Sequence, residues 1–160
     1  MAEETTPKLS IICFSGDFDK ALAAVVLANG GLAFDYEINL FFTFWGLNIL
    51  KKAQGRKAGR GSFMQRMFNF MMGGRDKLPL SKFNFAGMGP KLMTGLMKKK
   101  GVKDIDEMLE TAIALGANIF ACEMAMSVMG VTKEELIDEA QIVGVAKFIA
   151  SSEGGQVLFI

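Results

Sequence analysis

The sequence predicts an α/β protein: a three-layer α/β/α sandwich around a mainly parallel sheet of about five strands, with flavodoxin-like layering. The chain opens with an apolar run, a helical segment and a second apolar run. The same alternation returns after residue 100, and alternation of this kind is typical of parallel sheets. With 160 residues, 51% of them apolar, the chain is long enough to bury the core of one compact domain.

The first unit covers the first 44 residues. KLSIICF, residues 8–14, is a short apolar run typical of a buried strand. A helix capped by Ser15 or Asp17 then runs to about Asn29, where a Gly-Gly pair ends it. The aromatic run YEINLFFTF, residues 36–44, predicts a second buried strand.

Capping patterns and glycine stops define the elements after residue 100. Asp104 with Glu107, and Thr132 with Glu135, have the spacing of a capping box. They predict one helix that ends at Gly116 and another that runs from residue 132 to about residue 140. The remaining expected elements are strands at 118–122, 141–143 and 156–160 and helices at 123–130 and 145–152.

Residues 45–100 interrupt this pattern, and we expect them to form a basic, Met- and Phe-rich insertion within a single domain, 1–160. Ser62 can cap a helix at 63–72, and a second short helix can start at Pro90. Residues 51–100 hold 13 Lys and Arg but one acid, together with seven of the 12 Met and five of the 14 Phe.

The net charge of +1 is a cancellation. Residues 51–100 carry +12, whereas the other 110 residues carry 5 basic and 16 acidic side chains, or −11. This split favours docking of the insertion on a neighbouring subunit or an acidic partner. Peripheral contact of 51–100 with an anionic membrane and a loosely ordered loop are the alternatives. With one Trp, one Tyr and no binding motif, no nucleic acid is expected.

The composition excludes several kinds of chemistry. Without histidine there is no Ser-His-Asp triad and no His-bound zinc. Two cysteines are too few for a cysteine-only metal site or a disulfide scaffold, so we expect no metal, no cofactor and a cytoplasmic location. The polar N-terminus does not resemble a signal peptide, and apolar stretches of 13 or 14 residues are too short to span a bilayer.

Cys122 is the best candidate for a reactive group. It ends a predicted strand where a helix begins, at the sheet edge where ligands bind in open α/β folds. The start of a helix favours a thiolate, the nucleophilic form, whereas the adjacent Glu123 opposes it. Buried cysteines are common in cores, so a purely structural Cys122 stays open at this point.

Cys13, near the end of the first strand, is expected at the same edge of the sheet. It can be a core residue, or a resolving thiol if its Cα lies within about 7 Å of that of Cys122. Ser15 and Gly16 follow it and can line the same pocket. The turn FSGDFDK matches neither phosphate-binding glycine motif, which makes nucleotide binding a weak alternative.

Three segments carry a family resemblance. NIFACEMAMSVMGV, QIVGVAKFIASS and KLSIICFSGDFDKA together resemble the DsrE/DsrF-like family. The insertion NFAGMGPKLMTGLMKKKGV is similar to its Met-rich branch, whose members are described as DsrE-type or peroxiredoxin-like sulfurtransferases. The resemblance covers most of the chain and is weakest at 51–75.

The resemblance implies a cysteine-based sulfur carrier or sulfurtransferase. Cys122 matches the family cysteine that accepts sulfane sulfur as a persulfide or thiosulfonate and passes it to a partner. TusA-like or rhodanese-like proteins are the implied partners, and a trimer or hexamer is the implied assembly. The alternative is a non-catalytic binding or assembly module, in which Cys122 is structural and the basic insertion carries the function.

Overall fold

The computed structural model describes residues 6–53 and 61–160. Within them, five strands form one sheet in the order β4-β3-β2-β1-β5, and every neighbouring pair is parallel. The strands are β1 Lys8–Cys13, β2 Glu37–Phe42, β3 Asn118–Cys122, β4 Gln141–Val143 and β5 Gln156–Phe159. The predicted α/β fold with a parallel five-stranded sheet is therefore confirmed.

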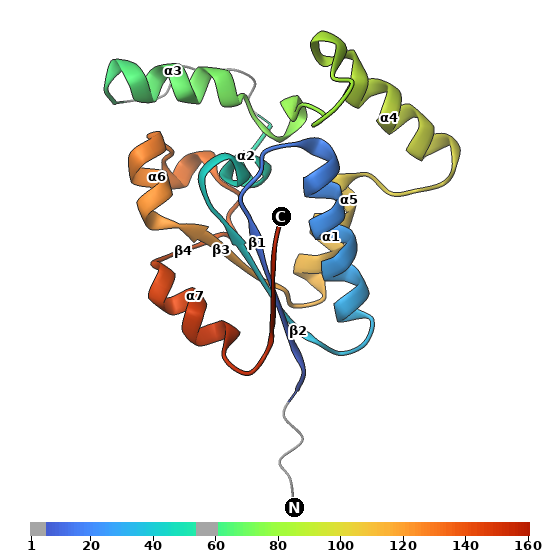
Figure 1. Cartoon of the computed structure of the whole chain (residues 1–160), viewed down its shortest axis with the longest axis vertical. Coiled ribbons are helices and arrows are strands. Elements are labelled where there is room, and N and C mark those ends of the chain that lie inside the picture. The colour runs from blue at the N-terminus through green and yellow to red at the C-terminus, as the bar shows by residue number, and fades with distance from the viewer. Residues whose placement is uncertain (1–5, 54–60) are drawn as a thin grey trace, which may run out of the picture.

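Helices cover both faces of this sheet (Figure 1). α1 (Phe18–Leu32) and α5 (Ile105–Ala114) pack together on one face, and α7 (Val145–Ser152) packs on β1 and β2 from the other. The short helices α2 (Leu47–Leu50) and α6 (Glu123–Met129) lie at the carboxyl ends of the strands. This edge is where the candidate site residues gather.

A polar row fixes the register of the three central strands. Ser10, Asn39 and Asn118 lie opposite one another in β1, β2 and β3. The Asn39 amide donates to Ser10 Oγ at 3.3 Å and to the Ser151 carbonyl of α7 at 3.2 Å, and Asn118 donates to Asn39 Oδ1 at 2.9 Å. A slip by one residue would break these bonds and bury their polar atoms unpaired.

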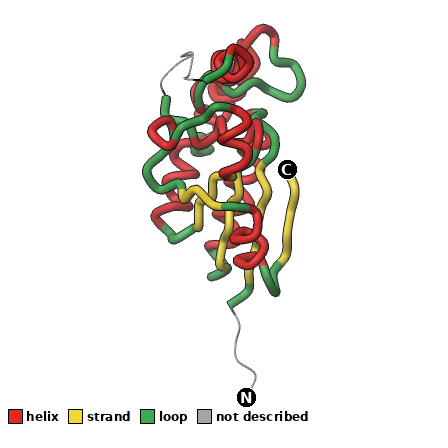
Figure 2. Tube along the Cα trace, turned by 90° about the vertical axis from the view of Figure 1, so that its left-hand side faces the viewer, coloured by secondary structure: helices red, strands yellow, loops and turns green. Residues whose placement is uncertain are grey.

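The insertion lies beyond the carboxyl edge of the sheet. Its two longer helices are α3 (Phe63–Met72) and α4 (Met88–Lys99), and both stay above the strand ends when the molecule is turned by 90° (Figures 1 and 2). Ser62 caps α3, as predicted, through a capping box with Gln65. The second helix begins at Met88, two residues before the predicted Pro90.

Polar contacts hold α3 on the body of the protein. Asn48 of α2 donates its side-chain amide to the Met72 carbonyl, and the buried Lys51 ammonium donates to Asn69 Oδ1. Asn69 in turn donates to the Gly130 carbonyl at 3.2 Å. Lys51 also pairs with Glu135 at 3.5 Å, so α3 is tied directly to Gly130, which ends α6, and through Lys51 to Glu135, which follows it.

The predicted helix over 132–140 is wrong. The capping-box contact forms, because the Thr132 N–H donates to the Glu135 carboxylate at 2.7 Å, but only a single 3-10 turn follows it. Leu136 is extended, buried and bridged to Lys51, and the Ile137 N–H donates to the Leu50 carbonyl. Tertiary pairing therefore takes the backbone groups that a helix would use.

The first helix also continues past its predicted end. α1 includes Gly30 and Gly31 and stops at Leu32 rather than Asn29. A Cβ at Gly31 would lie 2.6 Å from the Ile38 side chain, so this glycine allows close packing of α1 on β2. The Gly-Gly pair therefore does not end the helix, and Gly31 serves the packing of the helix on the sheet.

Candidate functional site

Cys122 is the last residue of β3, and α6 begins at the next residue. Its Cα lies opposite Val143 of the edge strand β4, and its side chain is 1% exposed. α2 and α6 both pack against β3. The structure places Cys122 at the predicted strand-to-helix junction and buries its thiol.

Cys13 ends β1 and is equally buried. It lies opposite Phe42, which lies opposite Ala121, so Cys122 stands one position further along its strand. Because successive side chains alternate between faces, Cys13 and Cys122 project from opposite faces of the sheet. Burial raises the pKa of the Cys13 thiol from 9.0 to about 12, which keeps this thiol protonated at neutral pH.

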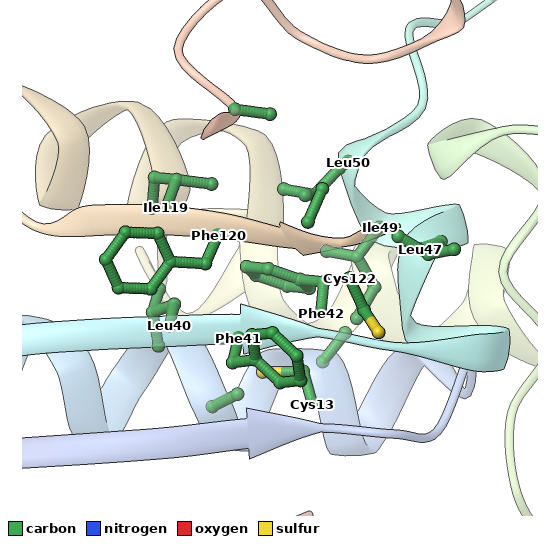
Figure 3. Packing of buried hydrophobic residues seen from close by; sticks show 14 of the residues in the cluster. Cys13, Leu40, Phe41, Phe42, Leu47, Ile49, Leu50, Ile119, Phe120 and Cys122 are labelled. Carbon is green, nitrogen blue, oxygen red and sulfur yellow. The ribbon is translucent and has the colours of Figure 1, made fainter. Parts of the chain in front are cut away.

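The fold does not bring the two cysteines together. β2 lies between β1 and β3, which separates the two Cα atoms by roughly 9–10 Å, twice the spacing of neighbouring strands. A disulfide needs Cα atoms within about 7 Å. In Figure 3 the two sulfurs do not point toward each other. The condition set for a disulfide between Cys13 and Cys122, a Cα separation within about 7 Å, does not fit this strand order.

Ser15 and Gly16 form the turn from β1 into α1. Ser15 Oγ donates to the Asp17 carboxylate at 2.9 Å and accepts from the Asp17 N–H at 3.2 Å. The Asp17 side chain makes no cap bond to the helix it precedes. A Cβ at Gly16 would lie 2.7 Å from the Trp45 carbonyl, so the two turns at this edge touch through their backbones.

Ser15 and Gly16 line a cavity of about 400 Å³ at the carboxyl edge of β1. Its other polar residues are Asp17, Lys20 and Asn48, and its apolar wall is formed by Phe14, Trp45, Met71, Met72 and Pro79. Cys122 and Glu123 are not among the lining residues. The predicted site residues therefore divide into a cavity beside β1 and a buried thiol at the end of β3.

Asn48 is the lining residue that sequence reasoning missed. Its side chain is 3% exposed and donates to the Met72 carbonyl, but its Oδ1 has no hydrogen-bond partner in the part of the chain that the structure describes. Nearby, the Lys20 ammonium and the Asp17 carboxylate form an ion pair at 3.1 Å. An isolated Asn in an apolar stretch gives no signal in the sequence, because only the tertiary contact with α3 buries it.

Glu123 contributes no buried charge to the site. It follows Cys122, and its side chain is exposed to solvent.

Among residues 6–53 and 61–160, no group of three or more acidic or cysteine side chains is arranged to hold a metal ion. In the same residues, no helix has the length and apolar character needed to cross a membrane.

The insertion exposes a large apolar surface. Among its described residues, six large apolar side chains are each more than 60% exposed: Phe63, Met71, Phe83, Phe85, Met88 and Leu92. Exposed lysines, including Lys91 and Lys98 of α4, lie among them. Apolar surface on this scale usually marks an interaction site.

The fold and the site define a class: a parallel α/β domain with a cysteine where a strand at the ligand-binding edge meets a helix. The model of the DsrE/DsrF/DrsH-like family matches residues 5–160. The chain belongs to this family, and the resemblance seen in the sequence is confirmed.

Two relatives are similar to the chain in sequence, and one solved structure is similar in fold. The chain is 45% identical to the uncharacterized protein YrkE of Bacillus subtilis, over 98% of this chain and 99% of that one. It is 33% identical to the sulfur carrier protein DsrE2 of Allochromatium vinosum, over 88% and 89%. The YchN protein of E. coli shares the fold, with a TM-score of 0.56 at 15% identity, over 97% of this chain and all of that one.

Proposed function

We propose that the protein is a cysteine-based sulfur carrier that accepts sulfane sulfur on Cys122 and passes it to a partner protein. Three observations support this: membership of the DsrE/DsrF/DrsH-like family, the 33% identical relative named a sulfur carrier, and the place of Cys122 at the carboxyl edge of β3. The last observation carries the proposal, because reactive groups of parallel α/β sheets gather at this edge.

The transfer is a thiolate exchange. The Cys122 thiolate attacks the outer sulfur of a donor persulfide, and a new S–S bond forms at Cys122. The donor S–S bond breaks, and its electron pair leaves with the donor thiolate. In the second transfer, an acceptor thiolate attacks the outer sulfur of the Cys122 persulfide. The S–S bond at Cys122 breaks, and the Cys122 thiolate leaves with its electron pair. Electrons balance without an oxidant, and no metal takes part. A thiosulfonate on Cys122 is the other form that the sulfur can take.

Burial of Cys122 requires local opening before transfer. β4 is a three-residue edge strand, and α2 and α6 are helices of four and seven residues, so the elements around the end of β3 are short. Short elements with few contacts open at the lowest free energy. We propose that a docking partner promotes this opening and that the closed state shields the bound persulfide from water.

The cavity residues Ser15 and Gly16 are proposed to serve the donor side of the same edge. Glu123, exposed beside the thiol, is proposed as a contact for a basic partner. Cys13 has no role in this scheme, because it faces the other side of the sheet and burial raises its pKa to about 12.

The insertion is proposed as the docking surface of a single domain, 1–160. Its exposed apolar side chains and its charge of +12 suit the acidic body of a neighbouring copy in a trimer or hexamer, or an acidic TusA-like or rhodanese-like partner. The same residues suit an anionic membrane, which is the competing assignment. We infer a cytoplasmic location, where thiols stay reduced.

Mass spectrometry of the intact protein tests the carrier. Incubation with polysulfide or tetrathionate is expected to add sulfur-containing mass to the wild type and to the Cys13→Ala variant, with the adduct mapped to Cys122. The Cys122→Ser variant is expected to gain none. An unmodified wild type, or an equally modified Cys122→Ser variant, would contradict the proposal that Cys122 carries sulfur.

A non-catalytic assembly module is the second candidate, and the 1% exposure of Cys122 favours it. The rate of alkylation separates the two functions. A carrier thiol reacts with iodoacetamide in the folded protein, and the rate rises when a partner or a loosened α3 promotes opening. A thiol that reacts only after denaturation identifies the assembly module.

A further inference from the structure

We propose that the cavity beside β1 binds a low-molecular-weight thiol that carries both an amine and a carboxylate, the chemical class of cysteine. The cavity has about 400 Å³, within the range of small-molecule sites, and lies at the ligand-binding edge of the sheet. Nothing in the relatives' names assigns it a ligand. A role of this cavity as an entry point for sulfur rests on the proposed carrier function, whereas binding of the ligand to the cavity does not.

The unpaired oxygen of Asn48 is the first argument for a ligand. The side-chain amide is held by its bond to the Met72 carbonyl, which fixes the amide group and leaves Oδ1 as an acceptor. This oxygen has less than 1 Å² of accessible surface and no hydrogen-bond partner among residues 6–53 and 61–160, and its residue lines the cavity, so a small shift of the side chain brings it to a ligand. A buried acceptor without a donor is costly, so the site favours a ligand with an N–H group.

The ion pair at the same cavity supplies the second argument. The Asp17 carboxylate and the Lys20 ammonium lie 3.1 Å apart and are both partly exposed to solvent. A ligand with an ammonium and a carboxylate can replace the Asp17–Lys20 ion pair by two ion pairs between itself and these side chains. Its ammonium then meets Asp17 and Asn48, and its carboxylate meets Lys20.

The apolar wall fits the rest of such a ligand. The aromatic rings of Phe14 and Trp45 and the side chains of Met71 and Met72 line the cavity. Thioethers and aromatic rings form favourable contacts with polarisable sulfur groups. A short sulfur-containing side chain therefore completes the match.

The same turn disfavours a simple anion site. Two N–H groups at the start of α1 are occupied, because Asp17 donates to Ser15 Oγ and Phe18 donates to the Pro79 carbonyl at 2.7 Å. The Asp17 carboxylate also lies at this helix start and repels an anion. A phosphate would meet the Asp17 carboxylate beside Lys20, and the N–H groups of Asp17 and Phe18 are not free to bind it.

Fluorescence of Trp45, the only tryptophan, reports occupancy of the cavity. The probe is S-methyl-L-cysteine, which cannot exchange sulfur. Saturable binding is expected, with 3-(methylthio)propionate and 2-(methylthio)ethylamine at least about tenfold weaker, since each lacks one charge. The variants Lys20→Met and Asp17→Asn are expected to weaken binding by at least about tenfold, and Asn48→Ala by a similar factor if its circular dichroism stays native. Lys147→Met, on α7, is the matched control and should bind normally.

Titration calorimetry repeats the measurement without relying on fluorescence. Absence of binding in both experiments up to about 10 mM overturns the proposal. Equal binding of 3-(methylthio)propionate or of inorganic phosphate also overturns it, because the cavity would then select a negative charge only. The Cys122→Ser variant should bind the probe normally. A wild type that binds the probe but takes up no sulfur rejects the carrier function alone. A wild type that takes up sulfur on Cys122 but does not bind the probe rejects only the ligand site.

Discussion

Cys13 and Cys122 lie on opposite faces of the sheet, with β2 between their strands. Both end a strand at the same edge, and both belong to the buried core shown in Figure 3. Their closeness along the edge does not make them partners, because register decides the face on which each thiol lies. The two thiols are expected to react independently.

Mild oxidation is therefore expected to produce no intramolecular disulfide. Diamide treatment of dilute protein, followed by non-reducing peptide mapping, should show Cys13 as a free thiol whether or not Cys122 is modified. The Cys13→Ala variant is the control and should be oxidised at the same rate. A peptide linking the two cysteines would mean that β1 or β3 leaves the sheet during oxidation.

Burial of Cys13 should make stability fall at high pH. Its pKa is about 12 in the folded chain against 9.0 for an unshifted thiol, so between these values the unfolded state binds fewer protons than the folded state. The free energy of unfolding then falls by about 1.4 kcal/mol per pH unit, starting near pH 9. Urea unfolding at several pH values should show this slope as the difference between wild type and Cys13→Ala. Parallel curves for the two proteins would contradict it.

Gly46 is expected to be intolerant of a side chain. A Cβ there would lie 1.9 Å from the Cys13 carbonyl, a backbone atom that cannot move without disturbing β1. Gly46→Ala should lower the free energy of unfolding by at least about 2 kcal/mol. Gly30→Ala is the matched control, because nothing lies within 4 Å of its Cβ and the residue is inside a helix. It should raise stability by about 0.5–1 kcal/mol. Equal effects would show that the turns do not touch as described.

Loss of Asn69 should release α3 without unfolding the sheet. Its side chain accepts from Lys51 and donates to Gly130, so Asn69→Ala removes both contacts and leaves a buried ammonium with only Glu135. Burial lowers the pKa of Lys51 and the Glu135 carboxylate opposes this, which makes the loss of a partner costly. Hydrogen exchange across 63–72 should accelerate at least about tenfold, while β1 and β2 stay protected. Arg66→Ala, an exposed change on the same helix, is the control. Unchanged exchange in Asn69→Ala would assign the docking of α3 to other contacts.

Local signals predicted most elements of the fold. Apolar runs identified all five strands, and capping residues identified the starts of α3 and α5. Predictions failed where a distant segment competed with a local signal. Thr132 and Glu135 made their capping contact, but Leu136 paired with Lys51, more than 80 residues earlier, and no helix followed.

The features of the candidate site also separate into those set by local sequence and those set by contacts between distant segments. The sequence by itself determined the family, the five strands and the place of Cys122 at the end of one of them, because these follow from local patterns and motifs. Only the tertiary structure decided that the two thiols lie on opposite faces of the sheet, which residues line the cavity and that Asn48 Oδ1 is buried beside it. Strand order and register assign each side chain to a face, and the packing of α3 on α2 buries Asn48. Such long-range contacts leave no trace in the spacing of residues along the chain.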